Sequence, residues 1–191
     1  MKFSDSTKPG RLWALRLARE EDVAALEALI CRSVRALQAP YYSSAQIEAA
    51  LGTVFGVDRG LIRDGTYFVA GQQSEIVGCG GWSRRRSLYG SDRDRAKPDP
   101  ELDPKIDAAR VRAFFVHPAW ARRGIGSSIM AACEEAIRAA GYCRVEIVAT
   151  LAGEPLYAAF NYTAVERSEI TLSNELTLPV VRMTKNLRAT H

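Results

Sequence analysis

Cysteine and histidine are scarce in this chain of 191 residues, which has four cysteines and two histidines. The cysteines show no Cys-x-x-Cys spacing, so a zinc site would have to be assembled from scattered positions. This pattern predicts reduced, buried thiols and no bound metal. The residues concerned are Cys31, Cys79, Cys133, Cys143, His117 and His191.

Long apolar runs are also missing, because no segment approaches the ~18 residues that a membrane helix requires. The opening segment MKFSDSTKPGRLWALRLAREED has no central apolar stretch of the kind found in a signal peptide. With 47% hydrophobic and 25% charged residues, the composition is that of an ordinary globular protein. It excludes collagenous, disordered and coiled-coil classes. We therefore predict a cytoplasmic protein that does not bind membranes.

Net charge and chain length bear on the kind of partner and on the number of domains. Lys and Arg number 26 against 22 Asp and Glu, which gives a net charge of +4, and the pI is about 9.0. This small surplus suggests an anionic partner without identifying it. The length suits one domain over residues 1–191, with a loose tail at 1–10 and an internal loop at 84–105 that contains three prolines.

Apolar spacing predicts helices in the first part of the chain. A short strand is expected within 12–19, the acidic residues 20–22 suit a first helical turn, and apolar residues then recur at helical intervals as far as Leu37. A second helix is expected from Ser43 or Ser44 to Leu51. From Thr66 the period changes to two, which predicts a β-hairpin; its strands are 66–70 and 75–83.

The second half of the chain alternates between strands and helices, and this order predicts an α/β (α+β) domain around a mixed sheet. A strand ends at His117-Pro118, since proline lacks a ladder donor, and Gly141 suits the end of the following helix. The expected elements are a strand at 109–116, a helix at 126–140, a strand at 144–150, a short helix at 155–160 and a last strand at 180–185.

The turn Arg122-Arg123-Gly124-Ile125-Gly126-Ser127 lies between that strand and that helix. Glycines let the backbone approach a ligand closely, and a helix N-terminus offers unpaired N–H groups to a phosphate or pyrophosphate. No lysine follows the glycines as a P-loop requires. Ile129 stands where a dinucleotide fingerprint needs its third glycine. A tight turn with incidental arginines is the alternative.

The block RAFFVHPAWARRGIGSSIMAACEEAIRAAGY resembles the acyl-CoA-binding core of the Gcn5-related N-acetyltransferase (GNAT) family, in which the loop pattern is [QR]-x-x-G-x-[GA]. Ala121 stands at the first position of that pattern, so one side-chain contact is lost while both glycines remain. GEPLYAAFNYTAVER is similar to the family's Y-x-x-x-G-[FY] segment, with Asn161 in place of glycine. Asn is the next best residue for a left-handed conformation. The resemblance extends over residues 109–166.

This resemblance implies a mixed, mostly antiparallel central sheet flanked by helices. It also implies an acetyl-CoA-dependent N-acetyltransferase that moves an acetyl group directly to a primary amine of a small molecule or peptide, with no metal. The main chain of Phe114, Phe115 and Val116 would pair with the pantetheine arm. The pyrophosphate would lie on the turn, whose residues are Arg122, Arg123, Gly124, Ile125, Gly126 and Ser127.

By the same resemblance, Tyr157 is the acid that protonates the leaving thiolate, whereas Tyr162 falls on the aromatic position that packs. The alternative role of Tyr157 is packing. A general base is not identified by the sequence: Glu146 and His117 are weak candidates, and water could relay the proton.

The resemblance also implies an acceptor site built from the first helices and neighbouring loops. Its candidate residues here are Arg32, Arg35, Tyr41, Tyr42, Trp82 and the run Arg84-Arg85-Arg86. Two other functions stay open. One is an acyl-CoA-binding sensor without catalysis. The other is a basic nucleic-acid binder, which Asp92 and Asp94 disfavour because they dilute the arginine run. Dimers are common in the family, but no residue here argues for one.

Overall fold

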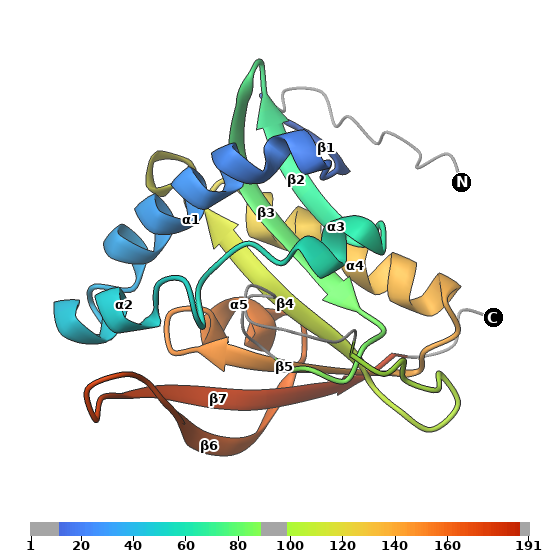
Figure 1. Cartoon of the computed structure of the whole chain (residues 1–191). Coiled ribbons are helices and arrows are strands. Elements are labelled where there is room, and N and C mark those ends of the chain that lie inside the picture. Colours follow the sequence, from blue (N-terminus) through green and yellow to red (C-terminus); the bar gives the residue numbers. More distant parts are fainter. Residues whose placement is uncertain (1–11, 89–98, 188–191) are drawn as a thin grey trace.

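The computed structural model describes residues 12–88 and 99–187, and in these ranges it shows one seven-stranded sheet in the order β1-β2-β3-β4-β5-β7-β6 (Figure 1). The strands are β1 Ala14–Leu17, β2 Tyr67–Gln72, β3 Glu75–Ser83, β4 Ala109–Val116, β5 Arg144–Thr150, β6 Thr163–Thr171 and β7 Thr177–Asn186. The α-helices are α1 Val23–Leu37, α2 Ser44–Ala50, α3 Arg59–Arg63, α4 Ile125–Ala139 and α5 Glu154–Ala159, and short 3-10 turns η1 Glu20–Asp22 and η2 Pro118–Trp120 precede α1 and α4.

The sheet opens in its middle, between β4 and β5. These two strands are parallel, whereas the other neighbouring strands are antiparallel. Their pairing runs only from Ala109↔Val145 to Val111↔Ile147. Beyond Val111 the backbone of β4 is not paired with β5, and Ala113 interrupts the strand with a φ of 60°. A parallel pair that separates in this way leaves a strand edge available to a ligand in the centre of the sheet.

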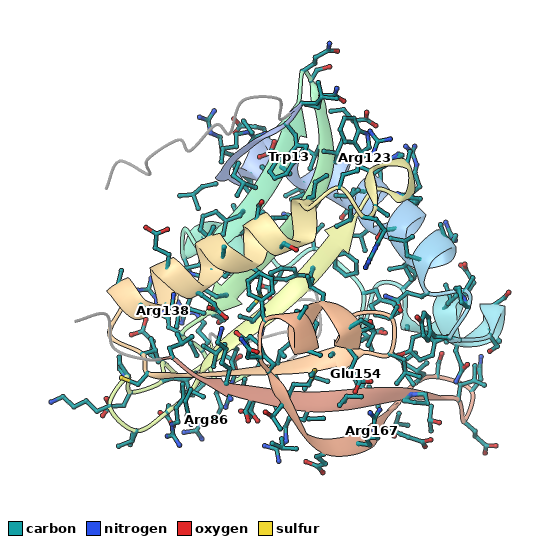
Figure 2. The ribbon with its side chains drawn as sticks, turned by 180° about the vertical axis from the view of Figure 1, so that it is seen from behind. Trp13, Arg86, Arg123, Arg138, Glu154 and Arg167 are labelled. Carbon is teal, nitrogen blue, oxygen red and sulfur yellow. The ribbon has the colours of Figure 1, made fainter. Side chains whose placement is uncertain are left out.

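Helices cover both faces of the sheet. Helix α4 lies on one face, where Ile129, Met130 and Ile137 are fully buried, and α1 lies on the other with Leu26 and Ile30 fully buried (Figures 1 and 2). Each helix buries one stripe at helical spacing, as the sequence predicts. The two cores meet at β4 and β5, so both helices are fixed relative to the opening.

Most of the predicted elements are confirmed. Helix α2 begins after Ser43, whose Oγ accepts a hydrogen bond from the N–H of Gln46, and the β2–β3 hairpin forms around the predicted turn. Asn161 adopts the left-handed conformation with φ 63°. The acidic residues 20–22 form a 3-10 turn, so α1 itself starts at Val23.

The sequence prediction missed β6 and α3. All but one of the nine residues of β6 are exposed, so the strand has no apolar alternation to detect. Helix α3 has five residues, too few for a helical period to be recognised. The described parts of the predicted loop, 84–88 and 99–105, approach each other at the bridge Arg85↔Glu101. The predicted tail at 1–10 lies outside the described residues.

All four cysteines are free, as predicted, but only Cys79 and Cys133 are buried and Cys143 is exposed. The expectation that the thiols are all buried is therefore wrong. Cys143 lies between α4 and β5, where the chain crosses the surface. Within residues 12–88 and 99–187, no helix has the length and apolarity needed to cross a bilayer.

Candidate active site

A cavity of about 290 Å³ occupies the opening of the sheet. One side of it is formed by the unpaired end of β4 and the N-terminus of α4, and the other by the end of β5, the end of α1 and the segment before α3. All the predicted cofactor residues line it except Arg123. Because the opening separates two strands that are otherwise paired, this cavity is the place where a ligand can replace missing strand contacts.

The N-terminus of α4 forms one part of the cavity wall. Gly124 is the residue before the helix, with φ 79°, and no side chain caps the N–H groups that follow. Arg122 also has a positive φ, 62°, which is rare for a residue with a side chain. The first N–H groups of an uncapped helix carry partial positive charge. The backbone here is therefore suited to a pyrophosphate.

Two contacts involve the residues of this turn. A Cβ on Gly126 would lie 3.2 Å from Cδ2 of Leu156 on α5, so glycine permits the close approach of the two helices. The guanidinium of Arg123 lies 5.0 Å from the centre of the Trp120 ring, and Figure 2 shows Arg123 beside the loop that leads into α4. A cation on an aromatic face keeps its charge near the turn without an ion pair.

The free edge of β4 presents backbone groups to the cavity. The N–H of His117 donates to the carbonyl of Val77 on β3 (2.9 Å), and because strand N–H groups alternate, that of Val116 faces the opposite way. There it donates to Oγ of Ser33 on α1 (3.2 Å). The predicted use of Val116 by a ligand therefore requires the Ser33 hydroxyl to release it, a contact that the sequence did not reveal.

Two buried side chains hold the irregular residue of β4. The thiol of Cys79 lies 3.7 Å from the carbonyl oxygen of Ala113, and the hydroxyl of Tyr67 lies 3.4 Å from the same oxygen. Burial raises the pKa of Cys79 to about 12, so the thiol keeps its proton. In a trans peptide the C=O and the next N–H point in opposite directions. The N–H of Phe114 therefore points away from Tyr67 and Cys79.

Tyr157, the predicted acid, lies on α5 with its ring at the cavity wall and only 5% of its surface exposed. Its ring contacts those of Phe114 (6.0 Å between centres) and Tyr162 (6.2 Å), both edge-on. Burial raises the pKa of Tyr157 well above its ordinary value, which keeps the phenol protonated. Tyr162 is buried in the core and does not line the cavity, as its packing position predicts.

The two weak candidates for a base lie outside the cavity. The Glu146 carboxylate is engaged by Arg110 on β4 and by Nη1 of Arg182 on β7 (2.7 Å). The ring of His117 accepts from the N–H of Ala119 (3.2 Å) and lies 2.8 Å from Nη1 of Arg32. Both groups are held in structural contacts. Among the described residues that line the cavity, none is Asp, Glu or His.

The wall opposite the turn is mostly apolar. Phe55 packs edge-on against Phe115 with 6.2 Å between ring centres. Other apolar side chains on this wall are Leu37, Val54, Leu88, Val148, Ile170 and Val180. They come from six different elements or loops of the chain, which is why no motif predicted them.

Two polar side chains on this wall were also missed. Nε2 of Gln38, at the end of α1, donates to Oγ1 of Thr150 at the end of β5 (3.2 Å), and Oε1 of Gln38 is buried without a hydrogen-bond partner. Arg112 forms a buried ion pair with Asp58 and donates to the carbonyl of Ser87 (2.8 Å). Burial lowers the pKa of Arg112 to about 10, so it stays charged at neutral pH.

The predicted acceptor candidates are dispersed and none lines the cavity. Tyr42 is a tether: its hydroxyl donates to the carbonyl of Pro179 (2.7 Å) and accepts from the N–H of Leu151 (2.9 Å). Arg35 pairs with Glu48 (2.7 Å) on α2, while Tyr41 is exposed and Trp82 is buried in the core.

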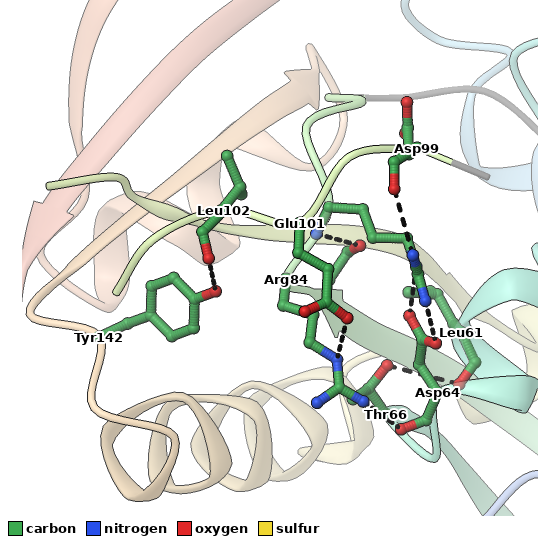
Figure 3. Close-up of polar contacts among 10 residues, drawn as sticks. Leu61, Asp64, Thr66, Arg84, Asp99, Glu101, Leu102 and Tyr142 are labelled. Carbon is green, nitrogen blue, oxygen red and sulfur yellow. Dashed lines mark hydrogen bonds and ion pairs between the residues drawn. The ribbon is translucent and has the colours of Figure 1, made fainter. Parts of the chain in front are cut away.

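The arginine run is largely neutralised by neighbouring carboxylates (Figure 3). Arg85 donates to both carboxylate oxygens of Asp64 at 2.7 Å and to the carbonyl of Asp99 (3.1 Å). Arg84 lies 3.8 Å from the carboxylate of Glu101. Two of the three arginines thus hold the described parts of the 84–105 segment against α3, and they do not form an exposed basic surface.

Comparison with known proteins identifies the family that this fold and cavity define. A family model described as "Acetyltransferase (GNAT) domain" matches residues 63–164, just over half of the chain. The chain therefore belongs to the GNAT acetyltransferase family and is an acetyl-CoA-dependent N-acetyltransferase, as the sequence resemblance implied. No curated protein matches the chain.

Solved structures share the fold. A GCN5-related N-acetyltransferase from Rhodopseudomonas palustris is 23% identical with a TM-score of 0.69, over 98% of this chain and 100% of that one. The paia N-acetyltransferase of Thermoplasma acidophilum, in complex with coenzyme A, is 13% identical with a TM-score of 0.60, over 90% and 97% of the two chains. The yncA protein of Salmonella typhimurium, with its cofactor acetyl-CoA, is 14% identical with a TM-score of 0.62, over 94% and 96%.

Proposed function

We propose that the cavity binds acetyl-CoA across the opening of the sheet and that a primary amine attacks the thioester directly, with Tyr157 as the acid. The observation that carries this proposal is the continuity of the cavity from the uncapped N-terminus of α4, past the free edge of β4, to the Tyr157 ring. That path offers successive sites for a pyrophosphate, an extended amide arm and a thioester. The complexes of two structural neighbours with coenzyme A or acetyl-CoA support the same reading.

The backbone supplies most of the binding groups. N–H groups of Ile125, Gly126 and Ser127 would bind the pyrophosphate, with Arg122 and Arg123 adding full charges beside it. The arm would pair with Phe114 and Val116 as an added strand, displacing Ser33 from the N–H of Val116. The N–H of Phe114, held by the anchored carbonyl of Ala113, would polarise the thioester oxygen.

The chemistry then needs one proton at sulfur and the loss of one at nitrogen. The amine lone pair forms the new N–C bond as the C–S bond breaks, and the phenol of Tyr157 donates its proton to the departing sulfur. Water returns a proton to Tyr157. Since no carboxylate or imidazole lines the described cavity, we assign the nitrogen proton to solvent and do not assign a dedicated base.

The wider setting is also a proposal. We infer a single domain over residues 1–191 in the cytoplasm, with acetyl-CoA and a primary amine of a small molecule or peptide as its reactants. Pairing of Arg84 and Arg85 with carboxylates disfavours nucleic acid as a partner. No bound metal and no membrane contact are proposed. A homodimer is proposed only from its frequency in the family.

Two measurements test this function. Acetyl-CoA is expected to raise the melting temperature of the protein, because a ligand that binds only the folded state stabilises it, while an oligonucleotide of similar charge is not. Thiol release from acetyl-CoA is then measured with a panel of amines. Stabilisation without thiol release from any amine would support the acyl-CoA sensor. Stabilisation by the oligonucleotide alone would favour the nucleic-acid binder.

A further inference from the structure

We propose that the acceptor of this enzyme is a neutral primary amine with a compact apolar body, and that Oε1 of Gln38 binds its N–H and orients the nitrogen. The inference rests on the proposed function, because it concerns the amine-binding half of the same cavity. It assigns a substrate class from the composition of one wall and a binding residue from one unpaired atom.

The wall that faces the free end of β4 is built to exclude water from an apolar group. Phe55 and Val180 are almost completely buried. The side chain of Ile170, on the edge strand β6, also lines this wall. Removing apolar surface from water favours a ligand that covers it with an apolar group. The whole cavity measures about 290 Å³, and the acetyl-bearing arm must share it. The acceptor body is therefore small and apolar.

The charged side chains that line the cavity also favour a neutral acceptor. Arg112 and Arg122 are the charged side chains among the described residues that line it, and both are cationic. A polyamine or an aminoglycoside needs carboxylates to compensate its charges on desolvation, and this wall has none. An acidic amino acid would need a free cation, but Arg112 is already satisfied by Asp58 and by the carbonyl of Ser87.

Gln38 provides the polar contact on this wall. Its amide is oriented by Thr150, whose Oγ1 accepts from Nε2 of Gln38 (3.2 Å) and from the N–H of Gly153 (3.2 Å). This leaves Oε1 buried without a hydrogen-bond partner, on a residue that lines the cavity. A buried acceptor without a donor costs free energy, and an amine N–H can supply that donor. Thr150 is thus a positioning residue, and Gln38 is a binding residue.

The protonation state follows from the same geometry. An apolar wall beside cationic side chains disfavours an ammonium ion, and an amide carbonyl does not compensate its charge as a carboxylate would. The amine therefore binds in its neutral form, with one N–H on Oε1 of Gln38. Its lone pair forms the N–C bond, the C–S bond breaks, the sulfur receives the proton of Tyr157, and the nitrogen loses one proton to water.

The first test compares amines on the wild-type protein. Thiol release is measured with 2-phenylethylamine, tryptamine, spermidine, kanamycin and L-glutamate, and acetyl-CoA binding is followed by calorimetry. We expect kcat/KM for the two arylalkylamines to exceed that for the other three by about 100-fold or more. We also expect it to rise with pH as far as the pKa of each amine. Preference for spermidine, kanamycin or glutamate would overturn the inference.

The second test changes the acceptor atom. Gln38→Leu is expected to lower kcat/KM for the preferred arylalkylamine by roughly 10- to 100-fold, with the acetyl-CoA affinity unchanged. Gln38→Glu restores an acceptor with a charge, so it is expected to recover activity toward cationic amines and to shift the pH profile to lower pH. Thr150→Val should give a smaller loss than Gln38→Leu. Gln72→Leu, on the β2–β3 hairpin outside the cavity, is the matched control.

The outcomes of these tests distinguish a failure of this inference from a failure of the proposed function. Unchanged kcat/KM in Gln38→Leu, at unchanged acetyl-CoA affinity, overturns the role of Gln38. A pH profile that bends at the same pH for amines of different pKa overturns the neutral-amine step. If acetyl-CoA binds but no amine releases thiol, the proposed function itself fails, and with it this inference. If Gln38→Leu does not fold, the Thr150→Val variant and the amine panel still test the inference.

Discussion

The two halves of the cavity come from different parts of the chain. One half is formed by backbone groups and the other by side chains. The anion-binding half lies within one segment, residues 109–127, and it acts through backbone N–H groups at the free edge of β4 and the start of α4. The acceptor half gathers side chains from α1, the segment before α3, Leu88, Arg112 on β4, and strands β5, β6 and β7. Backbone geometry tolerates substitution, whereas a wall of side chains changes with every residue. In the proposed function, one half binds the donor acetyl-CoA and the other selects the acceptor.

The largest effect is expected at Tyr157, which lies at the cavity wall. Tyr157→Phe removes the proton donor but keeps the ring contacts with Phe114 and Tyr162. We expect kcat to fall about 100-fold or more, with the acetyl-CoA affinity nearly unchanged, measured by thiol release and calorimetry. Tyr162→Phe is the control, because that ring is buried but outside the cavity. Equal rates in the two variants would remove Tyr157 from the mechanism.

The anion-binding half is tested by a charge at the exposed Ser127. Ser127→Asp places a carboxylate at the N-terminus of α4, where it competes with the pyrophosphate for the same N–H groups. Repulsion of about 1–2 kcal/mol predicts a Kd for acetyl-CoA raised roughly tenfold or more. Ser127→Asn has the same size without the charge and should bind normally. The order of preference among amines should not change, and a changed order would show that the halves are not independent.

A smaller effect is expected beneath β4. Tyr67→Phe removes one of the two donors near the carbonyl of Ala113, which should cost about 1 kcal/mol of stability and lower kcat several-fold through the N–H of Phe114. Tyr142→Phe is matched, because that buried hydroxyl donates to the carbonyl of Leu102 (3.0 Å) outside the cavity. Both variants should lose similar stability in denaturant titrations, but only Tyr67→Phe should lose rate. Equal rates would exclude a positioning role for Tyr67.

The smallest effect concerns Asp64, whose carboxylate holds the arginine segment. The hydrogen bonds from Arg85 lower the pKa of Asp64 below its ordinary value of 3.8. The pair therefore stabilises the fold above that value, and the contribution disappears as the pH falls through the lowered pKa. Asp64→Asn should lose about 0.5–1 kcal/mol at neutral pH and less at pH 3, measured by urea unfolding. Glu169→Gln, at an exposed carboxylate on β6, should show no such difference, and a pH-independent loss in Asp64→Asn would argue against the ion pair.

Prediction from sequence succeeded where the chemistry is local. The β4–turn–α4 unit could be predicted from residues 109–140, because glycines at fixed positions and a helical stripe are consecutive in the chain. The left-handed conformation of Asn161 followed from one short segment, and Tyr157 of the same segment lines the cavity, while its role as the acid stays a prediction. Glu146 shows the limit: its place on β5 was predictable, but its engagement by Arg110 and Arg182 depends on the neighbouring strands β4 and β7.

The acceptor half could not be predicted for the same physical reason. Gln38 is oriented by its hydrogen bond to Thr150, which is 112 positions away. Arg112 pairs with Asp58, just before α3. Strand β6 was missed because nearly all of its side chains face solvent. Each of these features arises only when segments that are distant in sequence pack together in the folded protein.

The alternation of strands and helices predicted the α/β fold, and the glycine turn predicted an anion-binding helix N-terminus, because each pattern is a property of neighbouring residues. The tertiary structure sets where β4 and β5 separate, how the N–H groups of β4 are paired and which side chains form the proposed acceptor wall. Those depend on strand pairing and on packing between segments far apart in sequence, where the free energy belongs to the contact and not to either residue alone.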